Sequence, residues 1–350
     1  MTVSHIDTIV ERKIEEMSKE PKTALLSLMK LSRRFSSSRF QAPVFSIVRH
    51  LLANEDSQYH ILIKHLLEQT SHSAIKNLGI NLGYNSWTYG AQTIRSTMQK
   101  VGYCIPWNIT FRWNPANPDG LNLKSIHQFI WEGNRMGIFS FCIRQETAHP
   151  ISGEIFNLFA AYPDCTFFWF LPNQLLAPIY INMLKKYENV VSVFDESSPY
   201  CLRNISNLKE RKILYGIYHT YSSADSKDQM NHKWSDYYAS YGSAFVIMLA
   251  DDTCSEDAQN QMSDYVYNAR YAQKFPFILL DFYSDIMRIN HLISGKNSFL
   301  EINSDRTLAY PHNFTESFRS GAPLSLYLAS SMPATTDFPH VISDFYISKL

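Results

Sequence analysis

Two different spacings of apolar residues divide the chain near residue 100. Before that point, apolar side chains recur three and four positions apart in segments broken by Pro, Asn and Ser, which is typical of amphipathic helices. The predicted helices cover residues 5–17, 22–35, 42–53, 57–70 and 72–85. The aromatic stretch GYNSWTYG, 83–90, reads as a turn-rich segment, either a recognition loop or a packing contact with the rest of the chain. The pattern predicts an all-helical N-terminal region.

Beyond residue 100, short apolar runs rich in aromatic and β-branched residues alternate with helical patterns. This alternation is typical of βαβ units, whose parallel strands are buried on both faces. The predicted strands cover 107–113, 138–143, 165–171, 190–194, 212–222, 243–251 and 275–282. The predicted helices between them cover 122–136, 151–161, 175–186, 228–241 and 255–273. The pattern predicts six or seven strands in an open doubly wound sheet or a partial barrel.

Composition narrows the class of protein. The chain has 350 residues, 45% of them hydrophobic, which is enough for one large domain or two. Lys+Arg and Asp+Glu number 32 each, so no net charge attracts nucleic acid or an anionic membrane. The start of the chain is charged and helical, and no stretch reaches the ~18 apolar residues of a membrane span. We expect a cytoplasmic protein with no nucleic-acid or membrane partner.

The five cysteines lie far apart, and no two have the close spacing of a zinc or iron–sulfur site. We therefore expect free thiols, buried or half-buried, in a reducing compartment. The cysteines are Cys104, Cys142, Cys165, Cys201 and Cys254.

Polar residues follow two predicted strands at their C-terminal ends, where parallel sheets bind ligands. Glu146 and His149 follow the strand 138–143, and Asp195 and Glu196 follow the strand 190–194. The four are candidates for acid/base or metal chemistry. The competing interpretation is a solvated loop with a salt bridge for Glu146 and His149, and helix caps or turns for Asp195 and Glu196. These are the commoner uses of such residues, so this interpretation is favoured.

Other polar residues allow the same two interpretations. Asp281 and Asp285 lie at the end of the last predicted strand, where caps and turns are the commoner use of Asp. His219 lies inside a predicted strand, where a hydrogen-bonded core histidine is commoner than a ligand. No serine-nucleophile elbow, P-loop, dinucleotide fingerprint or His-Glu-x-x-His motif is present. No independent catalytic motif is therefore available.

The order of segments resembles the radical S-adenosylmethionine (radical SAM) superfamily, in the subgroup with a helical N-terminal extension and a SPASM-like C-terminal tail. PWNITFRWNP, 106–115, is similar to the first strand, and LNLKSIHQFIWEGNRMGIFSFCI, 121–143, to the next helix, Gly-Ile junction and second strand. YPDCTFFWFLPNQLL, 162–176, is similar to the third strand and its Asn turn, at Asn173. FPFILLDFYSD, 275–285, and FLEINSDRTLAYP, 299–311, resemble the last barrel strand and a hairpin that opens the tail.

The resemblance implies an α/β fold: a radical SAM type (β/α)6 partial TIM-like barrel behind an all-helical N-terminal region. It implies three parts: a helical region over 1–100, the partial barrel over 101–290, and a degenerate SPASM-like tail over 291–350. The positions of the family's tail cysteines fall near Leu292 and near Pro311 or His312, so no auxiliary cluster is expected.

The loop after the first strand departs from the family. It is only ANPDG, 116–120, where the family carries three closely spaced cysteines, so the [4Fe–4S] cluster has no thiolate ligands. RQET, 144–147, replaces Gly-Gly-Glu-Pro and keeps only Glu146. The side chains of Arg144 and Gln145 would fill the space that the two glycines leave for S-adenosylmethionine. We expect both family cofactors to be lost.

Two hypotheses of different class follow. In the first, the chain is a degenerate, non-catalytic binding or accessory protein, whose partner is an active radical SAM relative or a peptide substrate in a peptide-modifying or natural-product pathway. In the second, it is a cluster-free enzyme that reuses the barrel mouth for acid/base or metal-dependent chemistry, with Glu146, His149 and Asp195. Whether the chain is an enzyme is open at this stage, although radical SAM activity is not expected.

Overall fold

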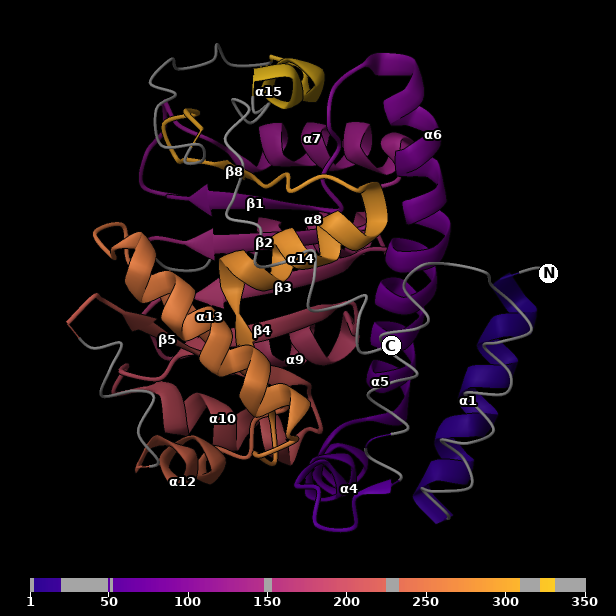
Figure 1. Cartoon of the computed structure of the whole chain (residues 1–350), viewed down its shortest axis with the longest axis vertical. Helices are drawn as coiled ribbons and strands as arrows, with labels where there is room; N and C mark the ends of the chain where they lie inside the picture. Colours follow the sequence, from indigo (N-terminus) through magenta and orange to yellow (C-terminus); the bar gives the residue numbers. More distant parts are fainter. Residues whose placement is uncertain are drawn as a thin grey trace.

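The computed structural model describes residues 3–19, 50, 53–147, 153–224, 233–308 and 322–330. Its centre is one sheet of eight strands, hydrogen-bonded in the order β7-β6-β5-β4-β3-β2-β1-β8 with every pairing parallel (Figure 1). The strands are β1 (Asn108–Trp113), β2 (Ser140–Gln145), β3 (Thr166–Leu171), β4 (Val190–Asp195), β5 (Tyr215–Tyr221), β6 (Phe245–Ala250), β7 (Ile278–Asp281) and β8 (Leu300–Ile302). The predicted α/β partial barrel is confirmed, since β8 lies beside β1 but is not paired with β7 among the described strands.

The seven predicted strands each overlap an observed one, and β8 is an addition. Its residues were expected to open a hairpin, but Leu300–Ile302 pairs in parallel with β1 instead. Up to Leu308, where the described residues pause, the hairpin shows one antiparallel bridge, between Ile302 and Leu308.

Helices follow the strands and cover the outer face of the sheet. They are α7 (Leu123–Met136), α8 (Glu154–Ala161), α9 (Pro178–Lys186), α10 (Cys201–Glu210), α12 (Lys233–Ser240) and α13 (Glu256–Tyr271), and α15 (Leu324–Ser330) packs on α7. Phe156 and Phe159 of α8 contact Trp169 of β3 at ring-centroid distances of 5.8 and 5.7 Å. Phe111 of β1 stacks on Phe129 of α7 at 6.1 Å. Since side chains alternate along a strand, the residues between these aromatics point to the inner face.

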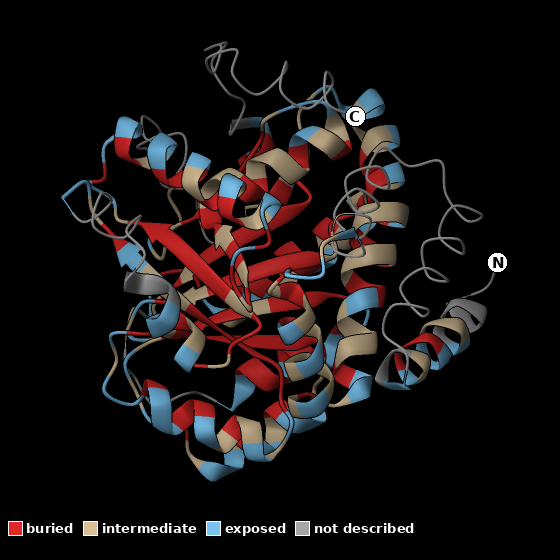
Figure 2. Ribbon diagram, turned by 60° about the horizontal axis from the view of Figure 1, so that its bottom comes forward, coloured by how far each residue is buried: buried red, intermediate tan, exposed pale blue. Residues whose placement is uncertain are grey.

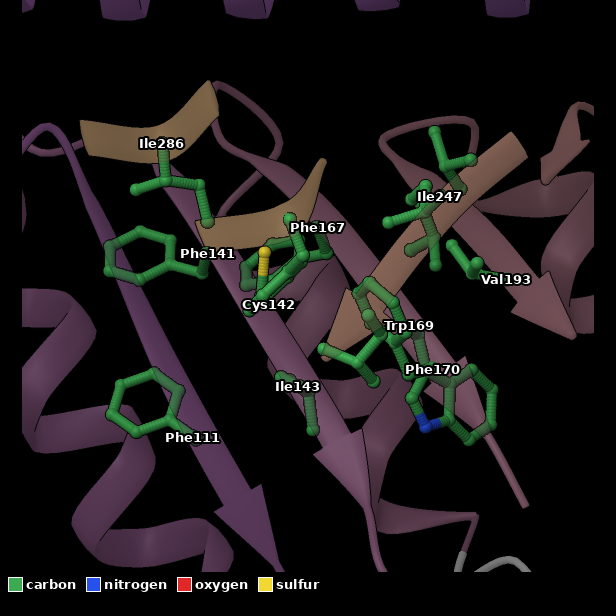
Figure 3. Packing of buried hydrophobic residues seen from close by; sticks show 14 of the residues in the cluster. Phe111, Phe141, Cys142, Ile143, Phe167, Trp169, Phe170, Val193, Ile247 and Ile286 are labelled. Atoms are coloured by element: carbon green, nitrogen blue, oxygen red, sulfur yellow. The ribbon is translucent and has the colours of Figure 1, made fainter. Parts of the chain in front are cut away.

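Buried residues are concentrated in the strands and on the helix faces turned toward them (Figure 2). Neighbouring strands contribute a row of stacked rings, in which Phe141 lies 6.3 Å from Phe111 and 5.8 Å from Phe167 (Figure 3). Fully burying one such side chain is worth about 1.5–3 kcal/mol. Aromatic rings therefore fill the core at β1 to β3, and two of these strands, β1 and β2, carry the arginines of the site described below.

Helix α14 (Phe282–Ser294) lies across the near side of the sheet in Figure 1 and packs on β6, β7 and α6. Trp107, just before β1, donates its indole N–H to the Ile286 carbonyl at 2.9 Å. Its backbone N–H donates to the Asn290 side-chain oxygen at 3.1 Å. Asp281 caps the helix by accepting from the Ser284 N–H at 2.9 Å. The helix thus bridges β7 and the start of β1.

The N-terminal region is helical, as predicted. It contains α1 (Val3–Lys19), α4 (Tyr59–Gln69), α5 (His72–Leu78), the π-helix η1 (Gly79–Gly90) and α6 (Ala91–Val101). The predicted helix 22–35 and most of 42–53 lie outside the described residues. None of the described helices is long and apolar enough to cross a membrane.

The stretch GYNSWTYG was predicted to be turn-rich, but it is part of η1, which runs without a break from α5 into α6. The side-chain amides of Asn81 and Asn85 donate to the backbone carbonyls of Cys165 and Asp164, at 3.0 Å each, just before β3. Trp87 contacts Trp107 edge to face at 6.0 Å. These contacts hold the segment in a helix and support the packing interpretation rather than a recognition loop.

Two glycines allow the helical region to approach the barrel closely. A Cβ at Gly90 would lie 2.3 Å from the Gly137 carbonyl oxygen, and a Cβ at Gly137 would lie 2.6 Å from the Gly90 carbonyl oxygen. Gly137 also has φ +101°, a conformation that L side chains rarely adopt, where it ends α7. The contact fixes α6 against the start of β2.

Candidate functional site

Arg112 and Arg144 lie side by side at the C-terminal end of the sheet. They occupy partner positions on β1 and β2, one step before the end of each strand. Both face away from the aromatic outer layer, because Phe111 and Ile143 beside them are on the alternate face. Two guanidinium groups on adjacent strands repel each other unless an anion lies between them.

Glu301 supplies that anion from β8. Its register partner is Thr110, so its side chain is on the same inner face. Oε1 accepts from Arg144 Nη1 at 2.6 Å and from Arg112 Nε at 3.1 Å. The Glu301 side chain is 1% exposed. Two half-buried arginines thus share one buried carboxylate. These three residues and Tyr283 are here called the mouth cluster.

Tyr283 and Phe282 bring the N-terminal end of α14 into the same place. The Tyr283 hydroxyl accepts from Arg144 Nη1 at 3.0 Å and lies 3.3 Å from Glu301 Oε2. The Arg144 guanidinium lies over the Phe282 ring, 5.8 Å from its centroid. Phe282 in turn contacts Phe170 of β3 at 5.3 Å. An aromatic wall therefore lies beside the cluster.

The electrostatics of the cluster favour its charged form. Burial lowers the pKa of Arg144, but the nearby Glu301 carboxylate outweighs burial and raises it. Burial also lowers the pKa of Arg112, but the hydrogen bond to Asp252 and then the Glu301 carboxylate outweigh burial and raise this pKa. Burial, and next the Glu301 carboxylate, raise the pKa of Tyr283. Tyr283 is therefore a neutral hydrogen-bonding group here and not an activated base.

Asp252 completes the arrangement from the loop between β6 and α13. Its two oxygens accept from Arg112 Nη1 and Nη2 at 3.0 and 2.7 Å. Unlike Glu301, its side chain is 68% exposed. The cluster thus has one buried and one exposed carboxylate.

The four residues predicted from the sequence are not brought together. Glu146 is exposed, and its backbone N–H continues the ladder by donating to the Trp113 carbonyl at 2.9 Å. His149 lies outside the described residues. Asp195 accepts from the Ser197 N–H and hydroxyl in a local turn, at 3.0 and 2.7 Å. Three of the four lie within the described residues, and these three, Glu146, Asp195 and Glu196, have separate environments.

Glu196 belongs to a different cluster on the outer face. It is buried, with Oε1 2.6 Å from His219 Nδ1, and its Oε2 accepts from the Tyr237 hydroxyl at 2.6 Å. Tyr241 donates to Tyr237 at 2.7 Å. Burial raises the pKa of Glu196, but the hydrogen bonds from His219 and Tyr237 outweigh it and leave the pKa below its ordinary value. His219 is a hydrogen-bonded partner of this carboxylate, as expected for a histidine inside a strand.

The two other aspartates also have structural roles. Asp281 caps α14, and Asp285 forms a two-point ion pair with Arg270 of α13 at 2.6 and 2.7 Å. Within the described ranges, no three His, Cys, Asp or Glu residues are arranged to hold a metal ion.

The cysteines do not fit an iron–sulfur cluster. All five are free thiols, four of them buried and Cys104 half-buried, as expected. Burial, the largest effect in each case, raises the pKa of Cys142, Cys165 and Cys201 to about 12, whereas a cluster needs thiolates. The described loop between β1 and α7 contains none of them. The residues present thus do not match the ligand set of the family's cluster.

The place of S-adenosylmethionine is also changed. Where the resemblance puts a glycine turn, Arg144 turns its side chain into the mouth cluster and Gln145 is buried. A ligand that must approach the backbone of residues 144 and 145 closely would meet the side chains of Arg144 and Gln145 first.

No model of a known protein family matches the chain, and no curated protein matches it in sequence. Solved structures do match. Streptococcus suis SuiB bound to precursor peptide SuiA has a TM-score of 0.50 and 10% identity, over 69% of this chain and 69% of that chain. Native anSMEcpe with bound AdoMet and Cp18Cys peptide has a TM-score of 0.39 and 10% identity, over 57% and 73%. Type I 3-dehydroquinate dehydratase from Clostridium difficile has a TM-score of 0.38 and 12% identity, over 56% and 84%.

Of these three, only the SuiB structure reaches a TM-score of 0.5, and at 10% identity it shows the fold and nothing about activity. The chain therefore shares a parallel partial-barrel fold with SuiB, which agrees with the predicted α/β partial barrel. The SPASM-like subgroup and the loss of the cofactors stay predictions.

Sequence reasoning missed Arg112, Glu301, Tyr283 and Asp252. A usable signal was present, because Arg112 and Glu301 are single charges inside otherwise apolar runs, NITFRW and FLEI. A charge in a strand buried on both faces requires a partner. Which charge pairs with which depends on the register of β8 beside β1, and no local pattern contains that information.

Proposed function

We propose that the chain is a radical SAM-like protein without an iron–sulfur cluster, and that it acts as a non-catalytic binding or accessory partner of an active enzyme in a peptide-modifying or natural-product pathway. The observation that carries this proposal is the mouth cluster. Its two arginines and Glu301 form ion pairs with one another at the end of the barrel. They supply binding charge without a thiolate, a free base or a group of metal ligands.

A peptide-related role is supported by the similarity to SuiB, whose structure was solved with its precursor peptide SuiA. Phe170 and Phe282 are buried and pack against each other, and Phe170 also packs against Tyr218, so the support for a peptide ligand comes from the similarity in fold and from the charges of the mouth cluster. Neither observation requires the chain itself to perform a reaction.

The test is reconstitution of the purified chain with iron and sulfide in the absence of oxygen, followed by desalting and absorption spectroscopy. We expect no visible charge-transfer bands, because closely spaced cysteines are absent. An intact radical SAM enzyme treated in parallel is the positive control. A stoichiometric cluster that survives desalting contradicts the proposal.

The second candidate is a cluster-free enzyme with acid/base chemistry. The observation in its favour is the Glu196–His219–Tyr237 cluster, which joins three titratable groups by short contacts. Alanine at Glu146 or His149 and glutamine at Glu196 separate the two functions. Loss of pathway activity in a variant that is still folded and still bound to its partner favours the enzyme, whereas unchanged activity in all three favours the accessory role.

A further inference from the structure

The mouth cluster has one more positive charge than its buried part can neutralise. Arg112 and Arg144 contribute two, and Glu301 contributes the one fully buried carboxylate bonded to both. The remaining charge is balanced by Asp252, whose carboxylate is mostly in solvent. The barrel mouth therefore accommodates one anionic group besides Glu301. In this structure that group is the Asp252 carboxylate, bound to Arg112.

Asp252 binds in the way that a carboxylate ligand would. Both its oxygens meet the outer nitrogens of Arg112 in the two-point geometry typical of arginine and carboxylate. Its loop does not depend on this ion pair, because Asp251 accepts from the Thr253 N–H at 2.8 Å and Ser255 caps α13. Exposed ion pairs are weak. A competing carboxylate can therefore take the place of Asp252 without unfolding the loop.

Arg144 offers further donors at the same place. In the described part of the chain only its Nη1 forms hydrogen bonds, to Glu301 and Tyr283. Its guanidinium lies over Phe282, and Phe170 contacts Tyr218 at 5.4 Å next to it. Phe282 and Phe170 are buried, so the anion site borders a packed aromatic cluster that holds the Arg144 guanidinium in place.

We infer that the barrel mouth binds the carboxylate of an amino-acid or peptide ligand, and that Asp252 is an internal competitor which this carboxylate displaces from Arg112. Once Asp252 is displaced from Arg112, the two arginines and Glu301 carry a net positive charge of one, which favours a monoanion over a phosphate dianion. This inference rests on the proposed function for the peptide character of the ligand and names the part of the ligand that is recognised.

The test uses N-acetylphenylalanine, with its free carboxylate, and N-acetylphenylalaninamide, which lacks it, titrated into the full chain by calorimetry or NMR. We expect the acid to bind and the amide not to bind. Asp252→Asn should bind the acid about fivefold more tightly, the factor that corresponds to an exposed ion pair of ~1 kcal/mol. Asp257→Asn is the matched control, since it removes an equal charge from the exposed start of α13, and it should leave binding unchanged.

Arg112→Lys keeps the charge but loses the two-point geometry, and should weaken binding of the acid about tenfold. If this variant does not fold, Asp252→Asn alone decides the outcome. Absence of binding, equal binding of acid and amide, no gain in Asp252→Asn, or tighter binding of inorganic phosphate than of the acid each overturn the inference. The proposed function fails separately, by the appearance of a cluster spectrum, so the two failures are distinguishable.

Discussion

Arg144 on β2 donates to Glu301 on β8 at 2.6 Å, across β1 and across 157 residues of chain. The bond ties β8, at one edge of the sheet, to β2, the strand that leads into RQET, 144–147. Because Glu301 is almost fully buried, both charges depend on each other and not on solvent.

Glu301→Gln should therefore be strongly destabilising. It leaves two half-buried guanidinium groups without their shared carboxylate, and the cost of about 3–5 kcal/mol for breaking a fully buried pair is the upper bound here. Asp252→Asn removes the exposed carboxylate of the same cluster and should cost at most ~1 kcal/mol. Urea denaturation of both variants measures the difference. Equal costs would show that burial does not distinguish the two carboxylates.

S-adenosylmethionine should not bind to the purified chain. Arg144 and Gln145 carry side chains where the family has glycines, and the Arg144 side chain is fixed by Glu301. Isothermal calorimetry against an intact radical SAM enzyme as positive control provides the measurement. One tight site in this chain would refute the expectation.

Gly90→Ala and Gly79→Ala should have opposite effects on stability. Both glycines are helical, with φ near −60°. A Cβ at Gly90 meets backbone oxygens of Gly137 and Asn85 at 2.3 and 2.6 Å, and such overpacking costs about 1–3 kcal/mol or more. A Cβ at Gly79 meets nothing within 4 Å, so alanine should stabilise by about 0.4–1 kcal/mol. Thermal denaturation of the two variants tests this, and similar melting temperatures would contradict the close approach of α6 and β2.

Asp281→Asn should stabilise the protein at neutral pH but not at acid pH. Burial, and next the Asp285 carboxylate, raise the pKa of Asp281 to about 6. A carboxyl with a raised pKa in the folded state binds its proton more tightly when folded, so stability is highest below pH ~4 and falls as the pH rises to about 6. Asn keeps the helix cap without titrating.

The stability of Asp281→Asn relative to the original chain should accordingly rise by up to about 3 kcal/mol between pH 4 and pH 7. Urea denaturation at pH 4, 5, 6 and 7 measures it. A difference that does not change with pH, or that falls as the pH rises, contradicts the assignment.

The alternation of strands and helices after residue 100 was predictable from sequence because it depends on local patterns of apolar residues. Each buried strand from β1 to β7 is a short apolar run, and a strand of this kind is visible without knowledge of its neighbours. Helices α6, α10 and α14 were not predicted, and β8 was assigned to a hairpin. The three residues of β8 are too few for a periodic signal, and their pairing with β1 depends on contacts distant in sequence.

The candidate site was predictable only in its location. The mouth cluster lies at the C-terminal edge of the sheet, where the sequence also placed its candidates. Those candidates were charged residues after the strands, whereas Arg112 and Arg144 lie one step before the strand ends. Residues such as Glu146 and Asp195 lie in turns, where polar side chains need no partner, while a charge inside a strand does need one. Burial and not residue type separates the two groups.

The pairing of β8 with β1 also determines the order of events while the chain is being synthesised. Arg112 leaves the ribosome 189 residues before Glu301. At the usual ~5–20 residues per second, β1 waits about 10–40 s with one edge unpaired and its arginine without a buried counter-ion. During that interval the nascent barrel exposes a strand edge and a positive charge, both of which the arrival of three residues, Leu300–Ile302, removes together.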